Sequence, residues 1–294
     1  MSSSFSGSLV AVVTPMRADG TLDLEAFARL IDWHLQSGTA GIVVGGTTGE
    51  SATLGTEELT TLVQRACAQS RGRIAVIAGC GTSATSRTVQ RVRALSQLPI
   101  QGLLIVTPAY NKPTQEGLYQ HFAAAAAAAR VPIIAYNVPA RTAVDLLPHT
   151  VARMAALPQI VGIKEAVPRI ERIRELRALC PAPFAVLSGD DATAREAVLA
   201  GAQGVISVTA NVAPAAMAEL MAAAGRGDRA QAERIDATLE SLHRALFIEP
   251  NPIPVKWALA RLGRIGEAIR LPLTVLSPEH HAAVTEALRR AGLL

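Results

Sequence analysis

The residue type that stands out in this sequence is lysine, because the chain uses it so rarely. Of the 28 basic residues only three are lysines, Lys112, Lys164 and Lys256, and the other 25 are arginines. A lysine can lose its proton and act as an amine nucleophile, whereas an arginine keeps its charge. Lys164 directly follows the apolar run 160–163, and burial disfavours the charged form of a lysine. The sequence therefore predicts that Lys164 attacks a carbonyl group to form an imine.

A structural ion pair is the alternative role for Lys164. Glu165 is its neighbour in the sequence, but adjacent residues on a strand point to opposite faces, so Glu165 is poorly placed to pair with it. The other two lysines are weaker candidates for the nucleophile. Lys112 lies in a proline-containing loop, and Lys256 is expected on the surface at the start of a helix.

Three hydroxyl groups follow other strand-like runs, namely those of Thr48, Tyr110 and Tyr136. Imine formation must release water, and neighbouring hydroxyl groups can relay the protons that this step needs. Either tyrosine alone would more often be a core or interface residue. The turn 46–49, Gly-Thr-Thr-Gly, can present backbone N–H groups to an anion such as a carboxylate, although its composition also suits a plain tight loop.

Such residues need a scaffold that brings several strand ends together. Short apolar runs alternate with segments of helical spacing such as 24–36 and 57–69, and near-continuous apolar runs are typical of strands buried on both faces. About eight such runs predict an α/β fold, the (β/α)8 TIM barrel, whose active site lies at the carboxyl ends of the strands. The runs are 9–13, 41–44, 74–78, 102–106, 133–136, 160–164, 184–188 and 204–207.

The strand-like runs stop after Val208, and the rest of the chain has a helical pattern. We therefore expect a catalytic barrel over residues 1–226 and a C-terminal helical extension over residues 227–294. A doubly wound sheet is the alternative fold, but it usually has fewer strands, and no G-x-G-x-x-G motif is present at its first turn.

Charge, motifs and cysteines argue against several classes of protein. The net charge is +4, but the basic residues are spread along the chain, so we expect no nucleic-acid partner. The most apolar stretch, 122–129, is too short to span a bilayer. Neither a nucleotide-binding nor a metal-binding motif occurs. Three widely spaced cysteines, and no basic leader within residues 1–8, predict a cytoplasmic protein.

The chain resembles the pyruvate-dependent aldolase and lyase family, specifically its dihydrodipicolinate synthase members, over essentially its full length. Several separate motifs carry this resemblance, in the same order as in the family. They are Gly-Thr-Thr-Gly-Glu-Ser-Ala-Thr at 46–53, Pro-Ala-Tyr-Asn-Lys-Pro at 108–113, Tyr-Asn-Val-Pro-Ala-Arg-Thr at 136–142, Gly-Ile-Lys-Glu-Ala at 162–166, Ser-Gly-Asp-Asp at 188–191, Gly-Val-Ile-Ser-Val at 204–208 and Glu-Pro-Asn-Pro-Ile-Pro-Val-Lys at 249–256.

The resemblance implies a role for each matching residue. Lys164 would form the imine with pyruvate, and this covalent imine would be the only cofactor-like group, with no metal. Tyr136 would relay protons together with Thr48 and Tyr110, and Tyr110 would serve a neighbouring subunit. The remaining residues would bind the substrates. The turn of Thr47 and Thr48 would hold the pyruvate carboxylate, and Arg141 would hold the carboxylate of the second substrate. Gly189 and Ile206 would contribute backbone groups near the lysine.

The resemblance also implies the reaction and the assembly. The second substrate would be L-aspartate 4-semialdehyde, and the product would be 4-hydroxy-tetrahydrodipicolinate, an intermediate of lysine and diaminopimelate biosynthesis. Members are commonly homotetramers built as dimers of dimers.

Two other functions remain open on the sequence. One is a sister aldolase that acts on N-acetylneuraminate or a 2-keto-3-deoxy sugar acid. Arg141 argues against it, because the loop of those enzymes lacks this arginine. The other is a barrel without catalysis that binds a small molecule, and we would expect such a barrel to have lost Lys164 or Tyr136.

Feedback inhibition by lysine is expected to be weak or absent. The resemblance places Thr56, Ser83, Arg87 and Ala109 where lysine-sensitive members have a histidine, an asparagine, a glutamate and a second tyrosine. Arg87 would set a positive charge against the ammonium group of the effector, and the missing tyrosine would remove a contact.

Overall fold

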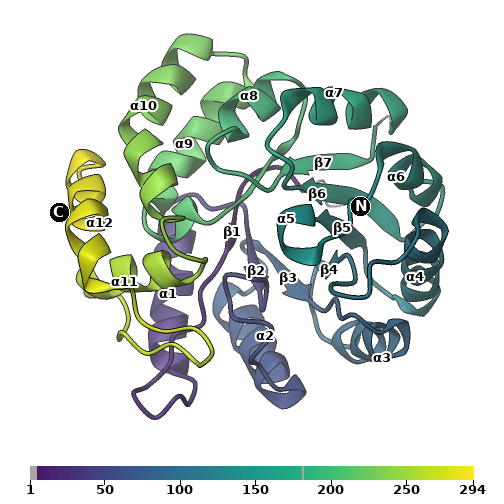
Figure 1. Cartoon of the computed structure of the whole chain (residues 1–294), viewed down its shortest axis with the longest axis horizontal. Helices are drawn as coiled ribbons and strands as arrows, with labels where there is room; N and C mark the ends of the chain where they lie inside the picture. Colours follow the sequence, from purple (N-terminus) through teal and green to yellow (C-terminus); the bar gives the residue numbers. More distant parts are fainter. Residues whose placement is uncertain (1–4, 181) are drawn as a thin grey trace.

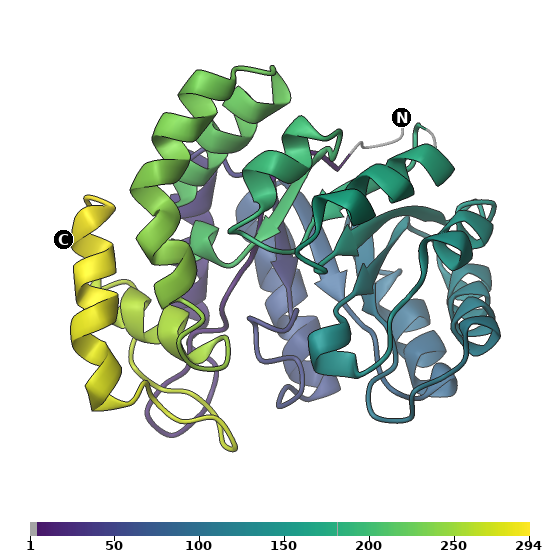
Figure 2. The same ribbon diagram turned by 45° about the horizontal axis from the view of Figure 1, so that its top comes forward.

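A computed structural model describes residues 5–180 and 182–294. Eight parallel strands form a closed barrel in the order in which they occur along the chain, and the last pairs with the first. The helices surround the strands (Figures 1 and 2). The predicted (β/α)8 barrel is therefore confirmed. The strands are β1 (Gly7–Ala11), β2 (Gly41–Val44), β3 (Ala75–Gly79), β4 (Gly102–Val106), β5 (Ile133–Asn137), β6 (Ile160–Glu165), β7 (Ala185–Ser188) and β8 (Gly204–Ser207).

Most predicted strands begin and end within one residue of the observed ones, and the largest error is at β1. The apolar run predicted a strand over 9–13, but the observed strand begins two residues earlier because the barrel closes there. Gly7 pairs with Gly204 of β8, and a Cβ atom added to Gly204 would lie 2.1 Å from the Gly7 carbonyl oxygen. This close approach of two backbones requires glycine, which hydrophobicity does not reveal.

Helices follow the strands and cover the outside of the barrel. The segment predicted from helical spacing at 24–36 is α1, whose first turn is capped by Asp23, which accepts a hydrogen bond from Ala26 N at 2.9 Å. The barrel helices are α1 (Leu24–Gln36), α2 (Thr56–Ser70), α3 (Thr85–Leu95), α4 (Gln115–Ala128), α5 (Pro139–Thr142), α6 (Pro148–Met154), α7 (Ile170–Leu179), α8 (Ala194–Leu199) and α9 (Pro214–Gly225), with a 3-10 turn at Thr209–Asn211.

The interior of the barrel is a packed apolar core. Alternate residues of the strands point inward, and this cluster includes Leu9, Val43, Ile77, Leu104 and Leu187. The opposite faces of the strands pack against the helices in a second, larger cluster. A core filled in this way leaves only the ends of the barrel for chemistry.

Three helices form the C-terminal extension: α10 (Arg229–Ala245), α11 (Ile253–Arg261) and α12 (Pro278–Arg290). Figure 2 shows them at one side of the barrel, next to α9 and α1. Because α10 packs directly against α9, the division at residue 226 stays a prediction. No helix in the described ranges is both long and apolar enough to cross a membrane. Residues 1–4, on which the expected absence of a leader partly depends, lie outside the described residues.

Candidate active site

Lys164 and Tyr136 lie side by side at the carboxyl ends of β6 and β5. The two residues are partners in the parallel register of these strands, and Lys164 Nζ lies 4.2 Å from the centroid of the Tyr136 ring. Lys164 is 5% exposed. No carboxylate of the described residues lies within ion-pair distance of its amine. This environment suits a nucleophile, because the amine is not engaged by a carboxylate.

Gly189 gives the Lys164 side chain its space. A Cβ atom at position 189 would lie 3.0 Å from Lys164 Cε and 2.9 Å from Ala166 Cβ. Any larger residue would push against the lysine stem. Ile206 lies on β8 with its side chain buried in the barrel interior.

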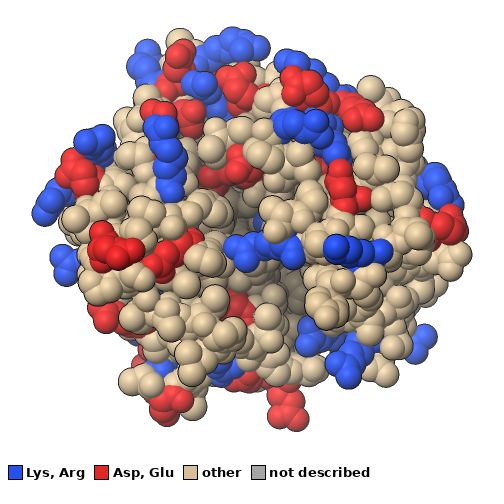
Figure 3. Space-filling model, viewed as in Figure 1, with Lys and Arg blue, Asp and Glu red and all other residues tan. Residues whose placement is uncertain are grey.

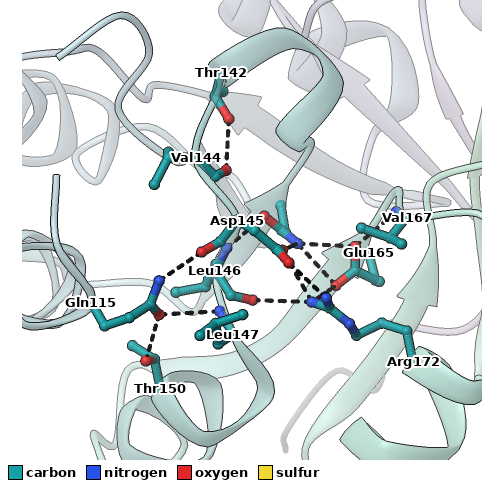
Figure 4. Close-up of polar contacts among 11 residues, drawn as sticks. Gln115, Thr142, Val144, Asp145, Leu146, Leu147, Thr150, Glu165, Val167 and Arg172 are labelled. Atoms are coloured by element: carbon teal, nitrogen blue, oxygen red, sulfur yellow. Dashed lines mark hydrogen bonds and ion pairs between the residues drawn. The ribbon is translucent and has the colours of Figure 1, made fainter. Parts of the chain in front are cut away.

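Glu165 points to the opposite face of β6, as the alternation of a strand predicts. Its carboxylate accepts hydrogen bonds from Asn137 Nδ2 at 3.1 Å and from Val167 N at 2.8 Å, and it lies 3.5 Å from Arg172 Nη1. Asp145 joins the same network by accepting from Asn137 at 2.7 Å and from Arg172 at 2.6 Å (Figure 4). Glu165 is thus committed to a separate buried network.

This network holds the strand ends in register. In the register of β5 and β6, Asn137 pairs with Glu165 directly after the pair of Tyr136 and Lys164. The network therefore fixes the backbone next to both reactive side chains. It also holds the loop after α5, since the side chain of Gln115 donates to the Asp145 carbonyl at 2.7 Å and accepts from Leu147 N at 3.1 Å (Figure 4).

The two carboxylates of the network titrate differently. Burial raises the pKa of Glu165 to about 7, although its hydrogen bonds from Val167 N and Asn137 and the charge of Arg172 act in the opposite direction. Burial also acts to raise the pKa of Asp145, but the hydrogen bonds from Arg172 and Asn137 outweigh it, so this pKa lies below its ordinary value. The network therefore combines a carboxylate that is charged at neutral pH with one that exchanges its proton there.

The Gly-Thr-Thr-Gly turn lies across the rim from these residues. Its later amides are used internally, since Gly49 N donates to Gly46 O at 3.1 Å and Glu50 N donates to Thr47 O at 3.1 Å. Within the described residues, the N–H groups of Thr47 and Thr48 donate to no protein acceptor. Thr47 lines a small cleft together with Gly46 and Tyr136. The turn therefore offers two free donors beside this cleft, which suits a carboxylate.

Thr48 is buried, and its partner comes from the C-terminal extension. Asn251 Nδ2 donates to Thr48 Oγ1 at 3.0 Å, and the backbone carbonyl of Asn251 accepts from Arg141 Nη2 at 3.1 Å. Arg141 is exposed on α5 at the rim. Asn251 thus connects two predicted site residues, although the sequence indicates it only as part of the motif at 249–256.

Tyr110 is set apart from the other predicted residues. It lies in the loop after β4 with a φ of 75°, and its side chain is 95% exposed. A non-glycine residue in the left-handed region is uncommon and points to a constrained loop. An exposed tyrosine of this kind cannot serve the cleft of its own chain in this position.

The expectation that Lys256 is an ordinary surface lysine is wrong. The helix begins at Ile253, Lys256 is 1% exposed, and its Nζ lies 2.5 Å from Glu50 Oε1. Burial lowers the pKa of Lys256, and the charge of Glu50 acts against that shift. The partner is 206 positions away in the chain, so no local pattern could have indicated it.

Cys80 also lines the small cleft but has no environment that activates a thiol. It is buried, and burial raises its pKa to about 12. A buried thiol that keeps its proton is a poor nucleophile.

Comparison with known proteins agrees with this geometry. Residues 4–291 match the Dihydrodipicolinate synthetase family. The chain is 55% identical to the 4-hydroxy-tetrahydrodipicolinate synthase of Methylococcus capsulatus, over 98% of this chain and 99% of the other. It is 54% identical to the enzyme of that name from Pseudomonas aeruginosa, with the same coverage.

Solved structures give the same result. The crystal structure of the chloride-inhibited dihydrodipicolinate synthase from Acinetobacter baumannii, complexed with pyruvate, superposes with a TM-score of 0.97. The two sequences are 47% identical, and the match covers 98% of this chain and 99% of the other. The chain belongs to the dihydrodipicolinate synthetase family.

A second cavity lies beside the small cleft. Its volume is about 770 Å³, and its lining includes all four residues considered for lysine feedback: Thr56, Ser83, Arg87 and Ala109. Arg91 lines both this cavity and the small cleft. The four positions inferred from the resemblance therefore do come together in space.

Two further observations concern charge and metal binding. Figure 3 shows basic and acidic side chains interspersed over the face seen in Figure 1, which is hollowed near its centre. Among residues 5–180 and 182–294, no three His, Cys, Asp or Glu side chains are grouped so that they could hold a metal ion.

Proposed function

We propose that this chain is a Schiff-base lyase that condenses pyruvate with L-aspartate 4-semialdehyde to give 4-hydroxy-tetrahydrodipicolinate, a step of lysine and diaminopimelate biosynthesis. The observation that carries the proposal is the Lys164–Tyr136 pair, a buried amine without a carboxylate partner beside a phenol at the end of neighbouring strands. The relatives bearing the corresponding enzyme name support the choice of reaction.

The first half of the reaction takes place on pyruvate. The neutral amine of Lys164 attacks the C2 carbonyl carbon, and the resulting carbinolamine loses its oxygen as water to leave the imine. The free N–H groups of Thr47 and Thr48 hold the pyruvate carboxylate. Tyr136, Thr48 and Tyr110 carry the protons that the departing oxygen takes up. No cofactor besides this covalent imine is needed.

The second half joins the two substrates. Loss of a proton from the methyl group turns the imine into an enamine, whose carbon attacks the aldehyde carbon of the semialdehyde and restores the imine. The amino group of the semialdehyde then attacks the imine carbon, which closes the ring and releases Lys164 as the free amine. Arg141 binds the carboxylate of this substrate at the rim, where its planar guanidinium suits a planar anion. Backbone groups of Gly189 and Ile206 contact the intermediate beside Lys164.

Assembly completes the site. The exposure of Tyr110 supports a role in the site of a neighbouring subunit, so the working form is a homo-oligomer, and we propose a dimer of dimers. We also propose a cytoplasmic location, which the three free cysteines of the chain support.

A coupled assay tests the proposed reaction against the sister aldolases. Pyruvate with aspartate semialdehyde should give turnover, whereas N-acetylneuraminate and 2-keto-3-deoxy sugar acids should not. Cleavage of N-acetylneuraminate without use of the semialdehyde would overturn the choice of substrate. An absence of turnover with every one of these substrates would favour a binding protein.

A further inference from the structure

We infer that Asn137 is a positioning residue for the second substrate. Its side-chain amide closes the loop 138–145 and thereby fixes where Arg141, which lies on this loop, holds the carboxylate of that substrate. The inference rests on the proposed function, in which Arg141 binds this carboxylate. It gives the contact between Asn137 and Asp145 a purpose that differs from holding the strand ends in register.

The loop that carries Arg141 begins and ends at the Asn137 side chain. Asn137 Nδ2 donates to Asp145 Oδ1 at 2.7 Å, and Leu146 N donates to Asn137 Oδ1 at 2.9 Å (Figure 4). Asn137 is fully buried, so water does not compete for these bonds. Because both bonds connect the far end of the loop to the last residue of β5, the loop has little freedom to move relative to that strand.

An amide is the side-chain group that position 137 requires. The two protons of Asn137 Nδ2 serve two carboxylates, Asp145 at 2.7 Å and Glu165 at 3.1 Å, while the amide oxygen accepts from Leu146 N. Each hydrogen-bonding atom of the amide therefore has a protein partner. A carboxylate has no proton to donate and a hydroxyl group has only one, so neither could replace the amide.

Inside the loop, Arg141 lies on the short helix α5. Arg141 N donates to Val138 O at 2.9 Å. Thr107, which follows β4, donates from its hydroxyl to Thr142 Oγ1 at 3.2 Å. The position of α5 relative to the strand ends therefore depends on this contact and on the closure at Asn137. Such fixed support is what a binding residue needs in order to meet its ligand in one geometry.

The contacts of Arg141 place its guanidinium group at the open end of the barrel. Arg141 follows β5, and its Nη2 donates to Asn251 O at 3.1 Å. The Asn251 side chain in turn contacts Thr48, which follows β2. Two strands separate β2 from β5 in the barrel, and the extension that carries Asn251 lies beside α1 and α9 (Figure 2). Arg141 therefore reaches from one side of the rim toward the other, where it can hold a carboxylate.

The test separates the two halves of the reaction. Asp145→Ala removes one of the two bonds that close the loop, and it should raise the KM for aspartate semialdehyde about 10-fold, because Arg141 is no longer held in place. Asn137→Ala removes both bonds and should raise this KM by about 10²-fold, as a misplacement of about 1 Å can. In Asp145→Ala, the KM for pyruvate and the rate at which borohydride traps pyruvate on Lys164 should stay within about two-fold of wild type, because this half does not use Arg141.

Two comparisons make the result specific. In an Arg141→Ala background, Asp145→Ala should raise the KM for the semialdehyde no more than about two-fold, because the group that the loop positions is gone. The matched control is Asp228→Ala, which removes an exposed aspartate that accepts from Gln231 N at 3.0 Å at the start of α10. It should leave both KM values unchanged. Thermal melting shows which variants fold, and Asn137→Ala replaces Asp145→Ala in these comparisons if the latter does not.

Three results would overturn the inference. They are a wild-type KM for the semialdehyde in the folded variants, an additive loss in the Arg141→Ala background, and a loss of imine formation as large as the loss of semialdehyde binding. The last result would show that the network acts only on the strand ends. A failure of the proposed function would appear separately, as a wild-type protein that forms no imine with pyruvate or does not use the semialdehyde.

Discussion

The two buried lysines of this chain lie in contrasting environments. Lys256 is 1% exposed and pairs with Glu50 at 2.5 Å. Lys164 is almost as deeply buried, at 5%, but its amine lies 4.2 Å from the centroid of the Tyr136 ring and forms no ion pair with any described residue. Burial alone therefore does not make a lysine a nucleophile. What distinguishes Lys164 is that its amine has no carboxylate partner among the described residues, whereas the amine of Lys256 is already engaged by Glu50.

The largest expected effect separates these two lysines. Lys164→Ala should lower kcat on the order of 10⁴-fold or more, because it removes the nucleophile itself, and it should leave the fold intact. Lys256→Met should instead lower the free energy of unfolding by about 3–5 kcal/mol, because Glu50 is left buried and unpaired. Initial rates and thermal melts measure both quantities.

A double variant distinguishes a loss of activity caused by unfolding from one caused by a role of Lys256 in the reaction. Lys256→Met combined with Glu50→Gln removes both charges, so much of the lost stability should return, and borohydride should still trap pyruvate on Lys164. A stable double variant that forms no adduct would show that Lys256 belongs to the chemistry.

The next largest effect concerns Tyr110. Tyr110→Phe should lower kcat by about 10²–10⁴-fold, as the loss of a general acid or base does. The fold should be unaffected, because this side chain is 95% exposed. Mixing Tyr110→Phe subunits with Lys164→Ala subunits should restore part of the activity, since one site of each mixed pair then has both residues. If subunits exchange and the mixture stays inactive, Tyr110 does not act across an interface.

A smaller effect concerns Glu165, which lies on the face of β6 opposite Lys164 and should make the stability of the protein depend on pH. The pKa of Glu165, about 7, lies above its ordinary value of 4.5, so the folded protein binds this proton more tightly than the unfolded chain does. Stability therefore falls as the pH rises from about 4.5 to 7. Glu165→Gln should remove about 3 kcal/mol of that dependence. Denaturant unfolding at several pH values measures it, and an unchanged slope would show that Glu165 does not titrate there.

The smallest expected effect is that of free L-lysine. Arg87 lines the cavity next to the small cleft, and a second positive charge at about 4 Å and an effective dielectric near 20 would cost on the order of 4 kcal/mol. Initial rates at physiological salt should therefore change little as lysine is added. Clear inhibition well below millimolar lysine would mean that the ammonium group finds an acid elsewhere.

The sequence predicted the fold because its pattern is strong and local. Buried parallel strands read as continuous apolar runs, so the eight strands were placed to within two residues, and Lys164 followed one of these runs directly. The opposed directions of Lys164 and Glu165 also follow from strand alternation alone.

Contacts between distant segments were not predictable in this way. Asn251 meets Thr48 across 203 positions, and Lys256 meets Glu50 across 206. Both depend on how the C-terminal extension folds back onto the barrel, which no periodicity of a single sequence encodes. The burial of Lys256 was missed for this reason, and the roles assigned to individual site residues stay predictions.

The most direct test of the contrast between the two buried lysines is borohydride reduction in the presence of pyruvate, followed by mass mapping of the peptides. Reduction fixes the imine as a stable adduct on whichever amine has reacted. We expect added mass on Lys164 and none on Lys112 or Lys256. An adduct on either of the other lysines, or no adduct at all, would contradict the account.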